Sequence, residues 1–318
     1  MKQVIGALVF ALLVQAVPLA QRAPTLVSET RAQLAKKDFA GAEKSLRDIQ
    51  ASAGVTPMWL EAFSWMGRAY LAEKNLDKAE AYAREAYKLA AAELKSRPMD
   101  QEPRLPIAIG AAIEVLAQVD GQRDARTDAL LFLDGEIKTF EGTSIIKRLQ
   151  KNRNLLSLEG TAAPALVAAD HLGPAPASMA DLKGKVVLMF FWAHWCPDCK
   201  NMAPALAQLN DTYKDRGFVI VAPSMRYGYV AGGKDATADE ETKYIDSIRQ
   251  ASYPVLAGQP IHLSEANHLR YGVSTTPTVV LVDRDGIIRL YHPGQMTLEE
   301  MDPLVSKLAG ASRTSAAQ

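Results

Sequence analysis

The sequence predicts two domains of different class: an all-α domain of helical hairpins, followed by an α/β domain in which helices flank a central mixed sheet. Three observations predict this. The 318 residues are the length of about two average domains. Residues 25–157 carry almost no strand pattern, and their apolar residues recur three or four apart. From Lys185 onward, short apolar runs rich in β-branched and aromatic residues alternate with helical patterns.

The composition limits the kind of partner that the chain binds. Lysine and arginine number 36, aspartate and glutamate number 36, and the formal net charge is zero. Apolar residues make up 48% and charged residues 23%, which is ordinary for a globular protein. Without a basic excess, nucleic acid is not an expected partner.

Residues 1–23 have the pattern of a secretory signal peptide. Lys2 precedes an apolar run over residues 4–14, and a stretch with small residues follows up to Ala23. The run is shorter than the roughly 20 residues that a permanent membrane span needs. We therefore expect export to the periplasm or another extracytoplasmic space, no permanent membrane span, and a mature chain that lacks Met1 to about Ala20. An uncleaved N-terminal anchor is the alternative.

Residues 24–158 are predicted to form the helical domain. Short breaks between the helical segments imply antiparallel hairpins. The breaks fall at 54–57, 74–75, 97–106, 120–121 and Gly142.

Part of this domain resembles the tetratricopeptide repeat. Small and aromatic residues have the repeat's spacing at Phe63, Gly67, Tyr70, Ala79, Ala83 and Ala86. Residues 38–43 resemble residues 75–80, which indicates two copies, the first without a recognisable first helix; a third pair over 103–138 is degenerate. Such arrays mostly bind partners, so this domain is expected to bind a protein or to dock the second domain. A generic alanine-rich bundle is the alternative.

The remaining chain is predicted as a linker over 159–174, an α/β domain over 163–311 and a disordered tail over 312–318. The linker is rich in small residues and proline. The expected elements are a strand at 186–191, a helix at 197–216, a strand at 218–221, a helix at 239–250, a hairpin of strands 278–282 and 287–291 turning at 283–286, and a helix at 298–308.

The only two cysteines, Cys196 and Cys199, follow a buried strand at the start of a helix. Their loop is too short to staple distant elements, and structural zinc needs four Cys or His ligands. No metal and no bound cofactor is therefore expected, although a copper-handling protein of the same fold is an alternative. The helix terminus stabilises a thiolate. We expect Cys196 to be the exposed nucleophile and Cys199 the less exposed resolving thiol.

Residues 191–199 resemble the active-site segment of the thioredoxin superfamily. Residues 182–188, Pro204 and residues 214–218 are similar to the TlpA/ResA-type periplasmic thiol–disulfide oxidoreductases. The resemblance covers about residues 163–311, and it implies a thioredoxin-like fold and thiol–disulfide oxidoreductase activity.

The resemblance also implies roles for residues outside the cysteine pair. Thr276 and Pro277 lie where the family has its cis-proline loop, which implies a cis bond at Pro277 and contact of both with substrate. Trp195 is expected on the surface beside Cys196, in contact with substrate.

Three residues around the pair are expected to modulate it: His194, Pro197 and Asp198. A protonated His194 would favour the Cys196 thiolate, and a solvated bystander is the alternative. The Asp198 carboxylate, taken to lie about 6 Å from the Cys196 sulfur, repels the thiolate by about 0.7–2.8 kcal/mol. We therefore expect a reductase with a potential below about −200 mV.

Two positions depart from the family pattern. Phe190 stands where thioredoxins carry a buried aspartate, and Met202 stands where TlpA-like proteins often carry a glutamate. A substitute carboxylate is expected from residues 223–262, where the sequence does not choose among Asp235, Asp239, Glu240 and Glu241. Ala193, in place of threonine, argues against peroxiredoxin chemistry.

A loop over residues 227–233, rich in glycine and tyrosine, is expected as a surface loop or as a lid on the substrate groove.

The function predicted from these residues is reduction or exchange of disulfides in exported proteins, with an upstream thiol electron donor. The alternative function is a tetratricopeptide-type binding or assembly protein whose redox domain is vestigial.

Overall fold

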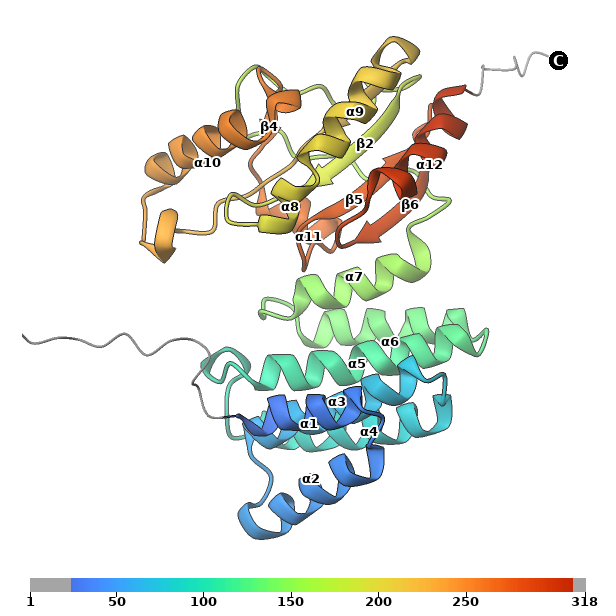
Figure 1. Ribbon diagram of the computed structural model, residues 1–318, viewed down its shortest axis with the longest axis vertical. Helices are drawn as coiled ribbons and strands as arrows, with labels where there is room; N and C mark the ends of the chain where they lie inside the picture. The colour runs from blue at the N-terminus through green and yellow to red at the C-terminus, as the bar shows by residue number, and fades with distance from the viewer. Residues whose placement is uncertain (1–23, 311–318) are drawn as a thin grey trace, which may run out of the picture.

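The computed structural model describes residues 24–310, so the predicted signal peptide and C-terminal tail lie outside the described residues. Figure 1 shows a helical half, a second half built on a β-sheet, and helix α7 between them. None of the helices within residues 24–310 is both long and apolar enough to cross a membrane. The helical half contains α1 (Leu26–Ala35), α2 (Phe39–Ala53), α3 (Pro57–Ala72), α4 (Leu76–Glu93), the 3-10 turn η2 (Met99–Gln101), α5 (Leu105–Gln122), α6 (Arg126–Thr139) and α7 (Ile146–Ser157).

The same turn joins the helices of three successive pairs. Lys37, Lys74 and Asp124 each have a φ close to +60°, in the left-handed region that a side chain rarely adopts. They connect α1 to α2, α3 to α4 and α5 to α6. Helix α1 therefore supplies the first helix that the sequence pattern did not reveal. The break predicted at 120–121 is misplaced, because α5 continues to Gln122.

Side-chain caps start the second helix of the first two pairs only. Asp38 accepts a hydrogen bond from the Gly41 amide, and Asn75 accepts one from the Lys78 amide. Ala125 stands at the same place before α6 and makes no side-chain cap. The third pair thus has the turn of the other two and no side-chain cap.

Helices α3 and α4 approach closely at Gly67. A Cβ built on this glycine would lie 3.4 Å from the Ala79 carbonyl oxygen and 3.6 Å from the Ala83 Cβ. The small residues that the repeat spacing singled out at 67, 79 and 83 therefore lie where the two helices touch.

The second half is a four-stranded sheet in the order β3-β2-β5-β6, with β2 parallel to β3 and the other neighbours antiparallel. The sequence did not predict the separate two-stranded sheet of β1 and β4, nor helix α11. The elements are β1 (His171–Leu172), β2 (Val186–Phe191), α8 (Pro197–Asn201), α9 (Ala203–Tyr213), β3 (Phe218–Val221), α10 (Ala238–Ser252), β4 (Ile261–His262), α11 (Glu265–Arg270), β5 (Thr278–Val282), β6 (Ile288–Pro293) and α12 (Leu298–Gly310), with the 3-10 turns η3 (Lys214–Arg216), η4 (Ala231–Gly233) and η5 (Pro254–Leu256).

Alternating residues of the central strand supply two apolar cores. Leu188 and Phe190 of β2 pack with residues of α9, α10 and α12 on one face. Met189 and Phe191 point to the other face, where Tyr271 and Leu158 cover them. All six residues of β2 are buried because both faces and both edges of this strand are covered.

The single helix predicted over 197–216 is wrong, because this segment forms α8, α9 and the 3-10 turn η3. It is interrupted at Met202, and α9 begins at Ala203 with Pro204 in its first turn. Proline has no N–H to donate and its ring clashes with the preceding turn, so the helix restarts.

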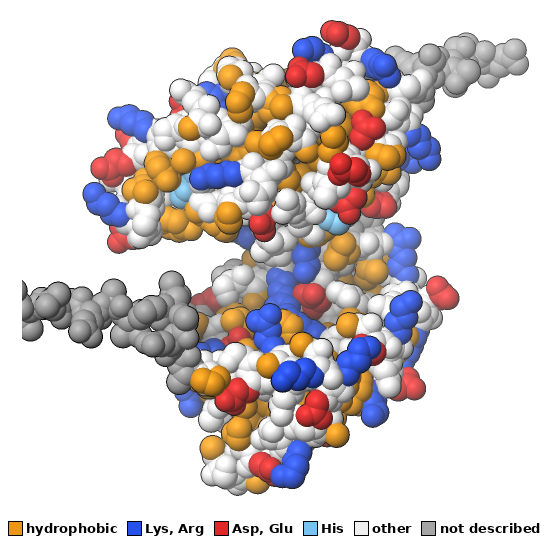
Figure 2. Space-filling model, viewed as in Figure 1, with side chains coloured by type: hydrophobic (Ala, Val, Ile, Leu, Met, Phe, Trp, Pro, Cys, Tyr) orange, Lys and Arg blue, Asp and Glu red, His pale blue; other side chains and the backbone are white. Residues whose placement is uncertain are grey.

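Helix α7 joins the two halves by direct contact. The Lys147 ammonium lies 2.6 Å from a carboxylate oxygen of Glu265 on α11. A Cβ on Gly272, after α11, would lie 2.4 Å from the Lys151 nitrogen, so only glycine allows this approach. Just beyond α7, the Glu159 carboxylate accepts a hydrogen bond from the Tyr291 amide of β6 at 2.9 Å. The space-filling view shows the resulting narrow waist between the two halves (Figure 2).

Candidate active site

The register of the sheet places two loops at the same end of β2. Phe191, the last residue of β2, pairs with Thr278, the first residue of β5. The chain after Phe191 leads to the cysteines, and the chain before Thr278 contains Thr276 and Pro277. This end of the sheet faces the helical half in Figure 1.

Cys196 and Cys199 form a disulfide with an S–S distance of 2.07 Å. Cys196 is the N-cap of α8, and the Cys199 amide donates a hydrogen bond to its sulfur at 3.0 Å. That donor would also favour a thiolate at Cys196 after reduction. The predicted exposure of Cys196 is wrong, since Cys196 is only 1% exposed. Cys199 is fully buried. The Cys196 sulfur is bonded to Cys199 and lies against the Thr276 loop.

The Thr276–Pro277 peptide bond is cis, as the family resemblance implies. The Thr276 carbonyl oxygen lies 3.4 Å from the Cys196 sulfur. The Thr276 hydroxyl is buried and has no hydrogen-bond partner among the described residues. The loop therefore covers the sulfur that we assign as the nucleophile.

Two tryptophans follow β2, one exposed and one buried. Trp195 is 46% exposed, and its ring meets the Tyr227 ring edge-on with centroids 5.4 Å apart. Trp192 is fully buried and donates a hydrogen bond to the Ala222 carbonyl at 3.1 Å. Pro197 and Asp198, between the cysteines, are exposed.

His194 is not a solvated bystander, because it is 2% exposed. Its Nε2 lies 3.1 Å from a carboxylate oxygen of Glu241 on α10. Burial lowers the pKa of His194 from its usual 6.5, while the bond to Glu241 partly opposes this. The ring is surrounded edge-on by those of Tyr227, Tyr229 and Tyr244.

Glu241 is the buried carboxylate near this site, at 1% exposure. It accepts hydrogen bonds from the amides of Tyr227 at 2.5 Å and Gly228 at 2.8 Å, as well as bonding His194. The sequence named it as one of four candidates, and the other three, Asp235, Asp239 and Glu240, are exposed. The sequence around Glu241 does not distinguish it from Glu240, because only the packing of α10 in the fold turns Glu241 inward and leaves Glu240 exposed.

The two positions that depart from the family pattern are apolar and buried. Phe190 packs beside Tyr253 with ring centroids 6.0 Å apart, and Met202 is 1% exposed.

Within residues 24–310, no group of three or more His, Cys, Asp or Glu side chains is arranged to hold a metal ion.

Known proteins resemble this part of the chain. Residues 158–307 match the Redoxin family. The thiol-disulfide oxidoreductase ResA of Bacillus thuringiensis (strain Al Hakam) is 30% identical over 151 residues, which cover 47% of this chain and 78% of that protein. The thioredoxin-like protein YneN of Bacillus subtilis (strain 168) is 28% identical over 125 residues, which cover 39% of this chain and 66% of YneN.

A solved structure of a thiol:disulfide interchange protein from Chlorobium tepidum TLS is 22% identical, with a TM-score of 0.35. The match covers 48% of this chain and 98% of that one.

Proposed function

Since this chain belongs to the Redoxin family, among the ResA-like thiol–disulfide oxidoreductases, we propose that it is an exported reductase of disulfides in other exported proteins. The observation that carries this proposal is the Cys196–Cys199 disulfide lying against the cis-proline loop. The apolar run within residues 1–23 supports export. The helical half would bind a protein partner or dock the redox half.

The chemistry uses the two thiols of the reduced protein. The Cys196 thiolate attacks one sulfur of a substrate disulfide, which forms a mixed disulfide and releases one substrate thiolate. The Cys199 thiolate then attacks the Cys196 sulfur, releases the second substrate thiolate and re-forms the internal disulfide. Two electrons pass to the substrate, and an upstream thiol donor must return them. Thr276, Pro277 and Trp195 would hold the substrate chain beside Cys196.

The surroundings of Cys196 support the reducing direction. A strong oxidant of this type stabilises its thiolate, typically with a nearby cation. His194 does not supply that cation, because burial lowers its pKa and leaves the ring mostly neutral at pH 7. Asp198, two residues from Cys196, would repel the thiolate. We therefore expect a potential below about −200 mV.

Trapping tests the proposal. The full chain should reduce the disulfides of insulin with dithiothreitol as electron donor, and Cys196→Ser should abolish this turnover. Cys199→Ser should instead accumulate mixed disulfides with substrate through Cys196. Equal labelling of both variants by substrate, or turnover that survives Cys196→Ser, would contradict the assignment. A binding protein with a vestigial redox half would show neither turnover nor trapping.

A further inference from the structure

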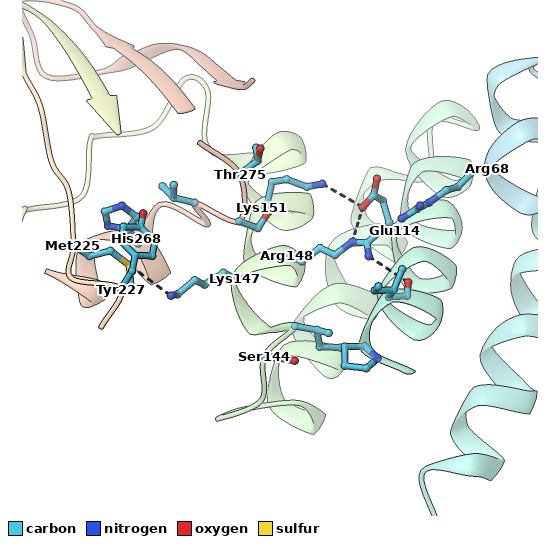
Figure 3. A pocket seen from close by; sticks show the side chains of 15 residues that line it. Arg68, Glu114, Ser144, Lys147, Arg148, Lys151, Met225, Tyr227, His268 and Thr275 are labelled. Carbon is cyan, nitrogen blue, oxygen red and sulfur yellow. Dashed lines mark hydrogen bonds and ion pairs between the residues drawn. The ribbon is translucent and has the colours of Figure 1, made fainter. Parts of the chain in front are cut away.

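A cavity of about 600 Å³ lies between the two halves of the molecule. Helices α3, α5 and α7 form its wall on the helical side, and residues 273–275, Met225, Tyr227 and His268 form the wall on the redox side. In Figure 3, Lys147 reaches from α7 toward Met225 on the redox side, whereas Arg148 and Lys151 extend toward Glu114 on the helical side. The helical half thus forms one side of a cleft whose other side belongs to the redox half.

The cleft reaches the surroundings of the redox pair. Thr275 lines it, and the next residue, Thr276, has its carbonyl oxygen 3.4 Å from the Cys196 sulfur. Tyr227 also lines it and packs against the exposed Trp195. A chain held in the cleft would therefore continue directly onto the surface beside Cys196.

The helical wall of the cleft is strongly basic. Four cationic side chains line it, and Glu114 is the single acidic one. Arg148 and Lys151 share the Glu114 carboxylate, at 2.9 Å and 3.2 Å. Figure 2 shows lysine and arginine side chains gathered in the waist, and Figure 3 shows these two converging on Glu114. One carboxylate cannot neutralise both.

Of the other two cations, Arg68 adds to this excess, because it forms no ion pair with any residue of 24–310. Lys147 pairs with Glu265, which is exposed to solvent. Burial and the neighbouring Arg148 lower the pKa of Arg68 to about 10, so it stays charged at neutral pH. His268 contributes no charge there, since burial lowers its pKa to about 4. A cluster built only to join helices would be expected to be nearly neutral, and this one is not.

Arg68 extends the basic surface beyond the cleft. It also lines a second groove of about 350 Å³ between α1 and α3. There the guanidinium groups of Arg31 and Arg68 both lie over the Trp65 ring, 4.4 Å and 4.7 Å from its centroid. Because Arg68 lines both hollows, their combined volume offers room for a polypeptide segment rather than for a single small anion only.

We propose that this basic cleft binds an acidic segment of a disulfide-bearing polypeptide substrate and presents its disulfide to Cys196. The inference rests on the proposed function and deepens it, since it names the class of substrate and gives the helical half a part in selecting it. Glutamate and aspartate side chains of the substrate would pair with Arg68, Lys147 and Lys151.

The test compares two synthetic peptides that contain the same disulfide loop. One carries a tail of four glutamates, and the other carries four glutamines in their place. The full chain should reduce the acidic peptide with the higher kcat/KM, by about tenfold at low salt, because each partly exposed charge pair is worth about two- to fivefold. Raising the salt from about 0.01 M to about 1 M should remove the preference, because the screening length falls from about 30 Å to about 3 Å.

Variants locate the preference in the cleft. Lys151→Gln, which keeps a hydrogen-bond donor for Glu114, should lower the acidic-to-neutral ratio by about two- to fivefold. Arg68→Gln should lower it similarly. Lys44→Gln is the matched control, because Lys44 is an exposed lysine paired with Asp48 on α2 and does not line the cleft. Equal ratios in the wild type, or a ratio that the cleft variants leave unchanged, would overturn the proposal.

A binding measurement separates this inference from the proposed function. The full-length Cys196→Ser/Cys199→Ser variant cannot exchange disulfides, yet it should bind the fluorescently labelled acidic peptide more tightly than the neutral one. If the wild type reduces neither peptide but this preference persists, the proposed function fails and the cleft assignment stands. If oxidised glutathione is reduced as efficiently as the acidic peptide, the cleft takes a small anion and the polypeptide assignment is wrong.

Discussion

Glu241 accepts hydrogen bonds from three donors on two separate loops. One donor is His194, two residues before the nucleophile, and the others are the amides of Tyr227 and Gly228. Tyr227 in turn packs against Trp195. A single buried carboxylate thereby fixes the loop that precedes Cys196 relative to Tyr227 in the wall of the basic cleft.

Replacing this carboxylate with an amide should destabilise the protein. In Glu241→Gln, the side-chain NH₂ must face at least one of the N–H donors that now bond to an oxygen. Leaving such a buried donor unpaired costs about 1–3 kcal/mol. Urea unfolding at pH 7 would measure this loss. Glu240→Gln is the control, because Glu240 is the exposed neighbour; a loss no larger in Glu241→Gln than in Glu240→Gln would contradict the role given to Glu241.

Sequence identified the reacting atoms of the site but not their surroundings. Cys196 and Cys199 are predictable because their spacing and their place after a strand are local features. The burial of His194 and Cys196 depends on α10 and on the Thr276 loop, which are distant in the chain. Such contacts leave no pattern around the residue itself.

At the scale of the elements, the three helical turns differ mainly in how the following helix begins. Asp38 and Asn75 cap α2 and α4, whereas Ala125 leaves the first amides of α6 without a side-chain acceptor. The backbone at Ala125 has φ −90° and ψ 45°, compared with −87° and 80° at Asn75 and −83° and 67° at Asp38. The third turn thus shares the φ of the capped turns, has a smaller ψ, and carries no residue that can cap the helix.

Ala125→Asn should therefore stabilise the helical half, by about 1 kcal/mol. The matched change in the opposite direction, Asn75→Ala, should destabilise it by a similar amount. Both effects would appear as shifts of the urea midpoint with an unchanged slope. If Ala125→Asn leaves the midpoint unmoved, the asparagine oxygen does not reach the amide of α6.

Long elements were predictable from their pattern, and short ones were not. The four strands of the main sheet lie within two residues of their expected bounds, because continuous apolar runs mark them. The two-residue strands β1 and β4 are too short to carry a pattern and exist only through their pairing. The break at Met202 follows from Pro204, which the sequence displayed and which we assigned to a continuous helix.

At the scale of the whole molecule, α7 belongs to both halves. It packs on α5 and α6 on one side, and on α11 and β6 on the other. Leu158, directly after it, lies in the apolar core beneath the sheet. The contact at Gly272 has no room for even one added methyl group.

Gly272→Ala should loosen this junction. The added Cβ would meet the backbone of Lys151, so α7 or the turn after α11 must move. Gly258→Ala is the control, since Gly258 has a similar positive φ of 72° but nothing within 4 Å of its added Cβ. Left-handed strain alone costs about 1–2 kcal/mol. Gly272→Ala should lose more stability than this and show faster proteolysis between the halves, and equal behaviour of the two variants would contradict the contact.

Because Trp195 is exposed, its fluorescence reports on the surface beside Cys196. Trp59 and Trp192 are fully buried and Trp65 is half-buried against two arginines, so a quencher in the solvent contacts Trp195 first. A substrate chain lying beside Cys196 would cover this ring and move its emission toward shorter wavelength. Binding of a substrate at the surface beside Cys196 can therefore be followed by intrinsic fluorescence, without a label and before any disulfide has been exchanged.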